Sequence, residues 1–301
     1  MMDNALSTRP ARTHRLAFVL GSGGVRSIAA LGVAERLARE GLQADLVVGC
    51  SSGALFGAQI ARGMHGEEAM RLATTLWSAE LTQQRRWRAY LQLVAPKLAG
   101  FSAGFALRDD RLIAERITNA FGDVQLEQLP TPLRVAATDA ATGQPVVLTR
   151  GYLVDALRAS MAVPIIFPSV AFGGRHLVDG VLSDPLPIAA AADARVVLSL
   201  GFHGSMPRRV DRLSRLVAQT STTLINNLMQ ARTDAAQARG QKVIAIELNL
   251  DRPVGLWETS AMPYLFEAGW RAAEASLLDI VAALEDADVC PVQPALPAFV
   301  C

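Results

Sequence analysis

The sequence predicts an α/β domain built around a mostly parallel β-sheet. Short apolar runs rich in β-branched residues alternate along the chain with longer segments of helical periodicity. In two places a short apolar run, a loop of small residues and a helical segment follow one another. This order is typical of strand–helix units in a parallel sheet. The chain has 301 residues, of which 51% are hydrophobic, so a sizeable core is available.

Composition excludes several classes of protein. The net charge of +1 gives no reason to expect a nucleic-acid partner. The three cysteines are scattered and the four histidines show no ligand spacing, so we expect no disulfide framework, metal or cofactor. Residues 1–15 lack the apolar stretch of a secretory signal, and no uncharged apolar run of about 18 residues predicts a membrane span. We expect a cytoplasmic protein; peripheral contact with the inner membrane face stays open, as does the oligomeric state.

The first strand is predicted at residues 16–20, after a polar and basic segment, 1–14, that we expect to be a disordered leader. A helix is predicted at 27–39, and the loop between them is Gly21-Ser22-Gly23-Gly24-Val25-Arg26. Arg26 replaces the third glycine of a dinucleotide fingerprint, and the Gly-Lys-Ser/Thr of a P-loop is missing. With both nucleotide-binding motifs excluded, two interpretations of this loop remain. Either its backbone N–H groups form an oxyanion hole, or the loop is a turn without a chemical role.

A second loop of small residues follows the predicted strand at 46–48 and precedes a helical segment. It carries the pattern G-x-S-x-G as Gly49-Cys50-Ser51-Ser52-Gly53. Between a strand and a helix this pattern is typical of a nucleophile elbow, a turn so tight that the residues two before and two after the serine must be small. Ser51 is therefore the predicted nucleophile, near the positive end of the next helix. The alternative is a turn in which the serine only caps that helix.

The middle of the chain offers two further segments with alternative interpretations. Residues 83–94 interleave arginines with aromatic and leucine residues, which predicts either a membrane contact through the arginines of residues 85–88 or a solvated helix face. Residues 96–104 are rich in Gly and Ala and form either a mobile flap or a simple connection. Helices are predicted on either side, at 54–77 and 109–121.

A candidate base follows the next group of elements. Strands are predicted at 133–139 and 145–149 and a helix at 152–160. Residues 161–168 contain two prolines and cannot be helical, so their apolarity predicts a buried, extended wall of a pocket. An apolar strand end then delivers Asp179 into a turn at Gly180. A carboxylate there can orient and deprotonate a serine, or it can bond its own backbone within the turn.

The last third of the chain supplies strands at 194–200 and 242–248 and helices at 212–239 and 264–284. An apolar stripe on the first of these helices predicts a core contact rather than a binding groove; it comprises Leu213, Leu216, Val217, Leu224, Leu228 and Ala231. Residues 289–301 form a Pro-rich tail that we expect to be loose. Because no repeat or linker divides the chain, we expect one domain over residues 15–288.

Taken in order, these pieces resemble the patatin-like phospholipase family. The resemblance is carried by the glycine loop, the serine elbow and the turn after Asp179, together with segments 137–143 and 159–164. It implies a three-layer α/β/α fold around a mostly parallel sheet and a Ser–Asp dyad without a histidine. It also implies that the protein hydrolyses phospholipids or other fatty-acyl esters through an acyl-enzyme, so the predicted domain would be a hydrolase.

The resemblance also assigns roles to individual residues. Ser51 becomes the nucleophile and Asp179 the general base, and backbone N–H groups around the glycine loop and the elbow become the oxyanion hole. The donors implied are Ser22, Gly23, Gly24 and Ser52, and the matching motifs are completed by Gly21, Arg26, Gly49, Gly53 and Gly180.

The chain departs from the family pattern at three positions. Ser27 stands where a glycine is usual, Ala30 where a histidine is common, and Val181 where a smaller residue is frequent. None of the three removes a reacting group, so we expect these departures to change substrate preference rather than chemistry. Ser27 in particular affects how closely the helix approaches the strand.

Two other functions stay open. Ser51, Asp179 and His203 follow the chain order of an α/β-hydrolase triad, with His203 just beyond the strand at 194–200. Alternatively, the fold serves as a regulatory module that binds lipid or protein with weak hydrolysis or none. Neither the head group, the acyl-chain length nor the ester position cleaved follows from the sequence.

Overall fold

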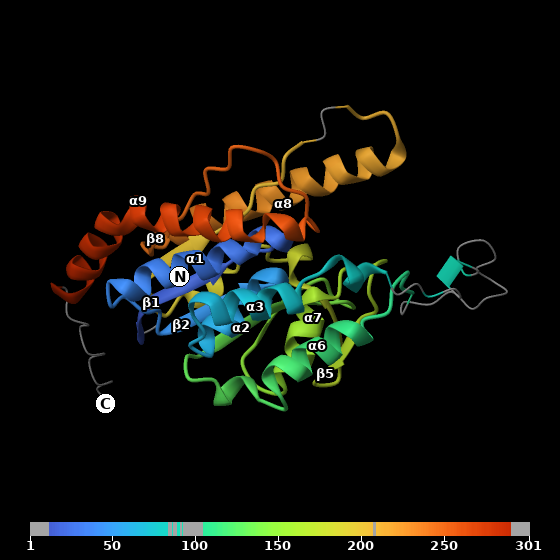
Figure 1. Ribbon diagram of the computed structural model, residues 1–301, viewed down its shortest axis with the longest axis horizontal. Helices are drawn as coiled ribbons and strands as arrows, with labels where there is room; N and C mark the ends of the chain where they lie inside the picture. Colours follow the sequence, from blue (N-terminus) through green and yellow to red (C-terminus); the bar gives the residue numbers. More distant parts are fainter. Residues whose placement is uncertain are drawn as a thin grey trace, which may run out of the picture.

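The computed structural model of the chain describes residues 12–83, 86, 89–90, 92, 105–206 and 209–289. Its centre is an eight-stranded mixed sheet in the order β5-β6-β3-β2-β1-β7-β8, with β4 paired to β3 (Figure 1). Most of the predicted leader, most of the arginine-rich segment, the stretch at 96–104 and the tail from residue 290 lie outside the described residues.

The parallel part of the sheet lies in its middle and at one edge. β1 pairs in parallel with β2 and β7, with Leu20 opposite Gly49 and Leu200, so these three strands end at the same edge of the sheet. The parallel strands are β1 (His14–Leu20), β2 (Leu46–Cys50), β3 (Leu133–Asp139), β7 (Ala194–Leu200) and β8 (Lys242–Ala245). β1 starts at His14, inside the predicted leader, because the His14 N–H donates to the Asp193 carbonyl.

The remaining strands run antiparallel beside β3. They are β4 (Pro145–Leu148), β5 (Val170–Phe172) and β6 (Arg175–Asp179). β6 lies next to β3 with Asp179 opposite Ala137, so its last residue is brought toward the middle of the sheet. The sheet is therefore mixed, with its parallel strands in the majority as predicted, and its antiparallel part carries the candidate base.

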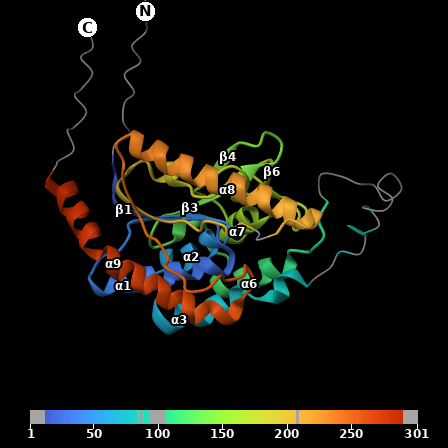
Figure 2. The same ribbon diagram turned by 90° about the horizontal axis from the view of Figure 1, so that it is seen from above.

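Helices cover both faces of the sheet, which confirms the predicted three layers (Figure 2). One face is covered by α1 (Ala29–Arg39), α2 (Ser52–Ala61), α3 (Gly66–Leu76), α6 (Arg111–Phe121), α7 (Leu153–Met161) and α9 (Met262–Val289). The other face is covered by α8 (Leu213–Ala238) together with a short 3-10 turn, Ile188–Ala191. The helices predicted within 54–77 are α2 and α3, separated by residues 62–65.

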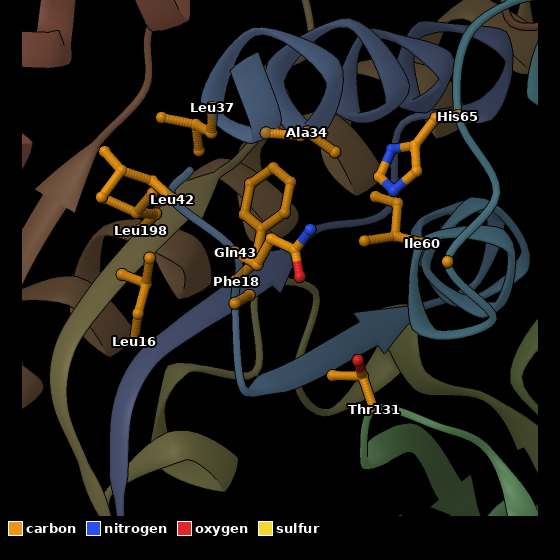
Figure 3. Close-up of a pocket in the computed structure, with 13 residues that line it drawn as sticks. Leu16, Phe18, Ala34, Leu37, Leu42, Gln43, Ile60, His65, Thr131 and Leu198 are labelled. Atoms are coloured by element: carbon orange, nitrogen blue, oxygen red, sulfur yellow. The ribbon is translucent and has the colours of Figure 1, made fainter. Parts of the chain in front are cut away.

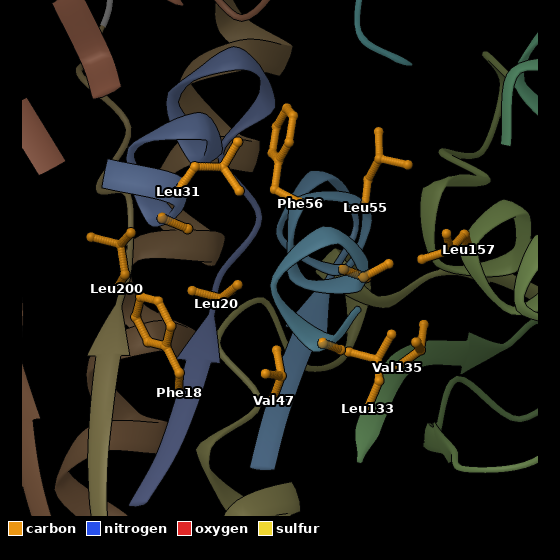
Figure 4. Packing of buried hydrophobic residues seen from close by; sticks show 14 of the residues in the cluster. Phe18, Leu20, Leu31, Val47, Leu55, Phe56, Leu133, Val135, Leu157 and Leu200 are labelled. Atoms are coloured by element: carbon orange, nitrogen blue, oxygen red, sulfur yellow. The ribbon is translucent and has the colours of Figure 1, made fainter. Parts of the chain in front are cut away.

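The alternation of side chains along β1 builds both cores. Phe18 and Leu20 point toward the α1/α2 layer, whereas Ala17 and Val19 point toward α8. Leu55 and Phe56 of α2, with side chains from α1, β3 and α7, fill the larger core above the strands (Figure 4). Both faces of β1 and β2 are thus apolar, as expected for strands that are buried on both sides.

Two predictions of burial are wrong. In the segment predicted as a buried wall, Phe167 is buried but Ile165 and Ile166 are 62% and 37% exposed. Ile165 has φ 72°, so the backbone turns there instead of running extended, and the buried side is not continuous.

The apolar stripe of α8 is the second case. Its leucines and valine in the first half of the helix are exposed, and the fully buried side chains of α8 are Met229 and Ala236. The first half of α8 reaches past the strands, and among the described elements none forms a layer against its outer side (Figures 1 and 2). Among the described residues, no helix combines the length and apolarity needed to cross a bilayer.

Candidate active site

The turn between β2 and α2 holds Ser51 in a strained backbone conformation. Its φ of 55° and ψ of −125° are rare for a residue with a side chain. The Ser51 N–H donates to the Ser160 hydroxyl at 2.7 Å, and the Ser51 carbonyl accepts from Ala54 and Leu55 in the first turn of α2. The residue is only 8% exposed. The strained backbone is held by hydrogen bonds to two helices, α7 and α2, which is the state expected of a functional turn.

Close approach explains why glycines flank this serine. A Cβ atom at Gly49 would lie 2.4 Å from Ala54 Cα. A Cβ atom at Gly53 would lie 2.5 Å from the carbonyl oxygens of Leu20 and Gly21. Both contacts are to backbone that cannot move aside, so the start of α2 packs directly on the end of β1. The two loops of small residues in the sequence are thereby brought into contact.

Asp179 lies directly beside the serine. Its Oδ2 accepts a hydrogen bond from Ser51 Oγ at 2.8 Å, and its Oδ1 accepts from the Val181 N–H at 2.8 Å. Complete burial raises the pKa of this carboxyl to about 7, against the opposing effect of the two hydrogen bonds. A carboxylate with such a pKa is a much stronger base near neutral pH than an exposed one.

The backbone of Asp179 is fixed by two further hydrogen bonds. Its N–H donates to the Ala162 carbonyl at 3.0 Å, and its carbonyl accepts from Thr138 Oγ1 at 2.8 Å. Because the one hydroxyl proton of Thr138 is used there, Ser183 Oγ donates to Thr138 Oγ1, 2.8 Å away. Asp179 is therefore positioned by β3, by the segment after α7 and by the turn that follows it.

The glycine loop presents its N–H groups unequally. The Ser22 N–H donates to the Pro185 carbonyl at 3.0 Å, and the Gly23 N–H donates to Ser52 Oγ at 3.2 Å. Gly24 begins a 3-10 turn, Gly24–Ile28, with φ 61°. Within the described part of the chain, the N–H groups of Gly24 and Ser52 have no acceptor. Of the four predicted oxyanion donors, these two are free to bind a charge.

Side chains tie the glycine loop to its surroundings. Ser27 Oγ lies 2.8 Å from Ser52 Oγ, which itself accepts from the Gly23 N–H, so a departure from the family pattern joins the loop to the elbow. Arg26 Nε donates to the Gly23 carbonyl at 3.2 Å, and Arg26 Nη1 donates to the His203 carbonyl at 3.1 Å. Arg26 thus links the glycine loop to the segment after β7 rather than reaching the dyad.

Other ionisable groups near the dyad are in unreactive surroundings. Burial raises the pKa of the Cys50 thiol well above its usual range, and the Asp179 and Asp184 carboxylates raise it further, so this thiol stays protonated. Burial also raises the pKa of Asp184, to about 6, although Arg232 Nε lies 3.3 Å from its Oδ1. His203 is exposed. In the part of the chain that is described, no cluster of three His, Cys, Asp or Glu residues could hold a metal.

A cavity at the other end of the sheet is separate from this site. It lies between α1 and the N-terminal ends of the strands, where Leu16, Phe18 and Leu37 form its apolar wall and Gln43 and His65 lie at its rim (Figure 3). Its volume of about 60 Å³ is far below the roughly 300–1,000 Å³ of typical ligand pockets. It contains neither member of the dyad and does not accommodate a fatty-acyl chain.

Comparison with known proteins fits this geometry. The sequence model described as patatin-like phospholipase matches residues 18–192, more than half of the chain and all of the site. The chain belongs to the patatin-like phospholipase family. This confirms the resemblance, and with it the fold class; the individual roles within the site remain proposals.

Relatives of this patatin-like protein are similar over part of their length. An uncharacterized NTE family protein of Mycobacterium tuberculosis is 35% identical over 228 residues, which is 72% of this chain and 59% of that protein. Patatin-like phospholipase domain-containing protein 7 of Rattus norvegicus is 31% identical over 192 residues, 62% of this chain and 13% of that protein. The crystal structure of VipD from Legionella pneumophila superimposes with a TM-score of 0.44 and 15% identity, covering 91% of this chain and 67% of that one. The chain thus spans less than two thirds of the relatives it matches in sequence.

Two residues of the patatin-like site were not predicted from the sequence. Ser160 and Thr138 both lie in segments that carried the resemblance, yet no role was assigned to either hydroxyl. Each donates to a backbone carbonyl, of Ala136 and Asp179 respectively, at 2.6 and 2.8 Å. Ser160 ends a predicted helix and Thr138 lies inside a predicted strand, and these positions were the available signal, because a buried hydroxyl needs a partner.

Proposed function

We propose that this protein is a serine acyl-ester hydrolase of the phospholipase A type, with Ser51 as nucleophile and Asp179 as general base. The observation that carries the proposal is the 2.8 Å hydrogen bond from Ser51 Oγ to Asp179 Oδ2 in a buried site. The raised pKa of Asp179 supports it, because a base near pKa 7 can both take and return a proton at neutral pH. Membership of the patatin-like phospholipase family supports a lipid ester as substrate.

In the first half-reaction, the Ser51 hydroxyl proton moves to Asp179 Oδ2 while Ser51 Oγ bonds to the ester carbonyl carbon. The carbonyl oxygen becomes an oxyanion, which the N–H groups of Gly24 and Ser52 stabilise, with the start of α2 adding a positive field. The C–O bond to the alcohol then breaks, and Asp179 gives its proton to the leaving oxygen. The product is an acyl group on Ser51.

In the second half-reaction, water repeats these steps. Asp179 takes a proton from water as the oxygen attacks the acyl carbon, and the same two N–H groups stabilise the new oxyanion. The Ser51–acyl bond breaks, the fatty acid leaves, and the proton on Asp179 returns to Ser51 Oγ. Loss of one oxyanion donor typically lowers the rate about 10²–10³-fold, so the glycine loop matters alongside the dyad.

The contacts favour a dyad over a triad. Both carboxylate oxygens of Asp179 accept hydrogen bonds, from Ser51 and Val181, so serine and aspartate meet without an imidazole between them. In a triad the carboxylate instead orients a histidine that contacts the serine. His203 is exposed, and its carbonyl accepts from Arg26. The substitution His203→Ala is therefore expected to leave turnover unchanged.

The test is hydrolysis of p-nitrophenyl esters of increasing acyl length by the wild type, Ser51→Ala, Asp179→Asn and His203→Ala. We expect turnover by the wild type and the histidine variant and none above background from the other two. The dependence on acyl length then measures how long a chain the site accepts. Retention of most activity by the Asp179 variant contradicts the dyad. A folded wild type that hydrolyses no ester favours a binding module instead.

The cytoplasmic location and the contact with the inner membrane face remain part of this proposal. A lipid hydrolase must reach esters in a bilayer, so we infer that the protein acts as a peripheral enzyme. Fractionation of cells that express the full chain tests the location. Recovery in the soluble and inner-membrane fractions supports it, and recovery outside the cell contradicts it.

A further inference from the structure

The first half of α8 has its apolar side turned away from the protein. Leu213, Leu216, Val217 and Leu224 are 76%, 49%, 56% and 65% exposed. At about 100° per residue, these four side chains fall within an arc of about 100°, so they form one continuous face, which we call the outer face of α8.

The opposite side of the same helix meets the protein through polar groups. Asn226 donates to the Gly204 carbonyl at 3.0 Å and accepts from the Gly204 N–H at 2.9 Å. Thr222 packs against the same glycine. The usual arrangement of a surface helix, apolar inside and polar outside, is therefore inverted here. An apolar face that the protein's own fold leaves exposed marks an interaction surface.

The outer face lies at the catalytic end of the sheet. Met229 of α8 lies beside Gly201, where an added Cβ atom would be 3.7 Å from its Sδ. Gly201 follows β7, which ends level with the glycine loop. The 16 residues of α8 before Met229 extend about 24 Å beyond this level. Figures 1 and 2 both show this half of α8 reaching past the strands.

Exposed apolar side chains also lie on the segments that carry the candidate site or contact it. Leu182, three residues after Asp179, is 54% exposed, and Leu256, which contacts Gly24, is 53% exposed. Ile165, in the segment after α7, is 62% exposed. Together with the outer face, these side chains form a group of exposed apolar residues at the catalytic end of the molecule. Grouped exposure of this kind indicates an interaction surface, whereas single exposed apolar residues do not.

Positive charge is concentrated beside the outer face. Residues 209–215 contain three arginines and one aspartate, a net charge of +2 in a chain whose total is +1. Arg212 and Arg215 lie within 3.6 and 2.9 Å of Asp211, so one carboxylate serves two guanidinium groups. The Arg212 side chain is 63% exposed. Apolar residues flanked by arginines match a surface of acyl chains beneath anionic head groups.

We propose that the outer face of α8, with Arg212 and Arg215 beside it, docks the protein on anionic phospholipid bilayers. The proposal rests on the proposed function, because a lipid substrate is what requires the catalytic end to face a bilayer. A second copy of the chain fits this face less well. In an isologous pairing both surfaces carry the same excess of arginines, so neither offers the anionic groups that these side chains would meet on a bilayer.

The test uses flotation of the full chain with vesicles, in the Ser51→Ala background so that the lipid is not consumed. Vesicles of phosphatidylcholine alone are compared with vesicles that contain about 30 mol% phosphatidylglycerol. The double substitution Leu213→Gln/Val217→Gln is expected to weaken partitioning onto the anionic vesicles about tenfold or more. Leu278→Gln, at an 83% exposed position of α9, is the matched control and is expected to change nothing.

A second pair of substitutions separates charge from apolar burial. Arg212→Gln/Arg215→Gln is expected to weaken binding to the anionic vesicles severalfold. It is also expected to reduce the dependence of binding on salt concentration, because two of the charges that salt screens are removed. All α8 variants are expected to turn over a soluble short-chain p-nitrophenyl ester at the wild-type rate when Ser51 is present, because none of these residues touches the dyad.

The outcomes distinguish the two proposals. Vesicle binding that depends on α8, in a protein without esterase activity, supports the docking surface and contradicts the proposed function. Esterase activity without vesicle binding, or flotation of the Leu213/Val217 variant equal to that of the wild type, overturns the docking surface. A dimer in analytical ultracentrifugation that this variant dissociates overturns it as well, because the face would then be a contact between copies.

Discussion

The nucleophile elbow and the first half of α8 are opposite cases of how this chain uses apolar and polar groups. At the elbow, Ser51 and Asp179 lie inside an apolar core, and every polar atom that positions them has a partner. On α8, Leu213 and Leu224 lie in solvent while polar side chains face the protein. Both regions belong to the same end of the sheet, within one chain.

The difference shows what each region contributes. The elbow is stabilised from all sides, so a buried carboxylate and a strained serine can persist there. The outer face of α8 contributes less to stability than the core does, because its four apolar residues stay 49–76% exposed in the folded protein. Stability is thus concentrated around the proposed reaction centre, and the first half of α8 beyond it keeps its apolar side exposed.

The largest expected effect comes from comparing the same substitution at one leucine in each region. Leu55→Ala removes a side chain that is 1% exposed in the core above the strands, and it is expected to lower the free energy of unfolding by about 2–5 kcal/mol. Leu224→Ala removes the same atoms from a 65% exposed position and is expected to change it by less than about 0.5 kcal/mol. Urea unfolding followed by circular dichroism measures both. Equal losses would mean that α8 is packed in solution.

The ionisation of Asp179 is expected to change the free energy of unfolding with pH, by nearly as much as the core substitution does. Because its pKa is raised to about 7 in the folded protein, the native state holds more protons than the unfolded state between about pH 4 and 7, and stability from this group falls as pH rises through that range. Asp179→Asn carries no charge, so its stability relative to the wild type should increase across this range, by up to about 4 kcal/mol at pH 8.

Urea unfolding of both proteins at pH 4 and pH 8 measures this effect. Asp184, whose pKa is also raised by burial, is present in both proteins, so its contribution cancels in the difference. If the difference in stability between the two proteins does not change with pH, the charge on Asp179 does not destabilise the folded protein.

Ser160 tests the support of the strained serine. Ser160→Ala leaves the buried Ser51 N–H without its acceptor and is expected to lower the free energy of unfolding by about 1–3 kcal/mol. Because the displaced nucleophile affects the chemical step, kcat should fall about tenfold or more with KM nearly unchanged. Ser169→Ala is the matched control, since that hydroxyl has only a 3.5 Å contact with His176. Loss of stability with unchanged kcat would make Ser160 purely structural.

The smallest expected effect is at Ser27. Ser27→Ala removes the hydroxyl that lies 2.8 Å from Ser52 Oγ. It is expected to lower the free energy of unfolding by about 1 kcal/mol. Ser52→Ala should cost more, because it also removes the acceptor of the Gly23 N–H. In a double-mutant cycle the two effects should be less than additive, since both substitutions remove the same contact. Full additivity would show that the two hydroxyls do not interact.

The sequence predicted those parts of the fold that short-range rules decide. The strand–loop–helix order around Ser51 follows from β-branched runs and small residues, and the predicted helices and strands of the central sheet are present with ends shifted by a few residues. Residues 16–20 and 46–48, for example, lie within β1 and β2.

Which side of a helix is covered, and which hydroxyl meets which amide, depends on distances between elements. The 3.6-residue period of α8 is the same whether its apolar side faces the core or a partner, so the period predicted a helix but gave the wrong side. The role of Ser160 likewise required the approach of α7 to the end of β2. The backbone turn at Ile165, where φ is 72°, could not be read from an apolar segment with two prolines.

The most direct test of the central claim is the rate at which a fluorophosphonate labels Ser51 as a function of pH. If Asp179 takes the serine proton, labelling by the wild type should rise with pH and reach half its maximum near pH 7, where this buried carboxyl loses its proton. The rise should be lost in Asp179→Asn and kept in His203→Ala. Wild-type labelling by the Asp179 variant, or loss of labelling in the His203 variant, would contradict a Ser51–Asp179 dyad.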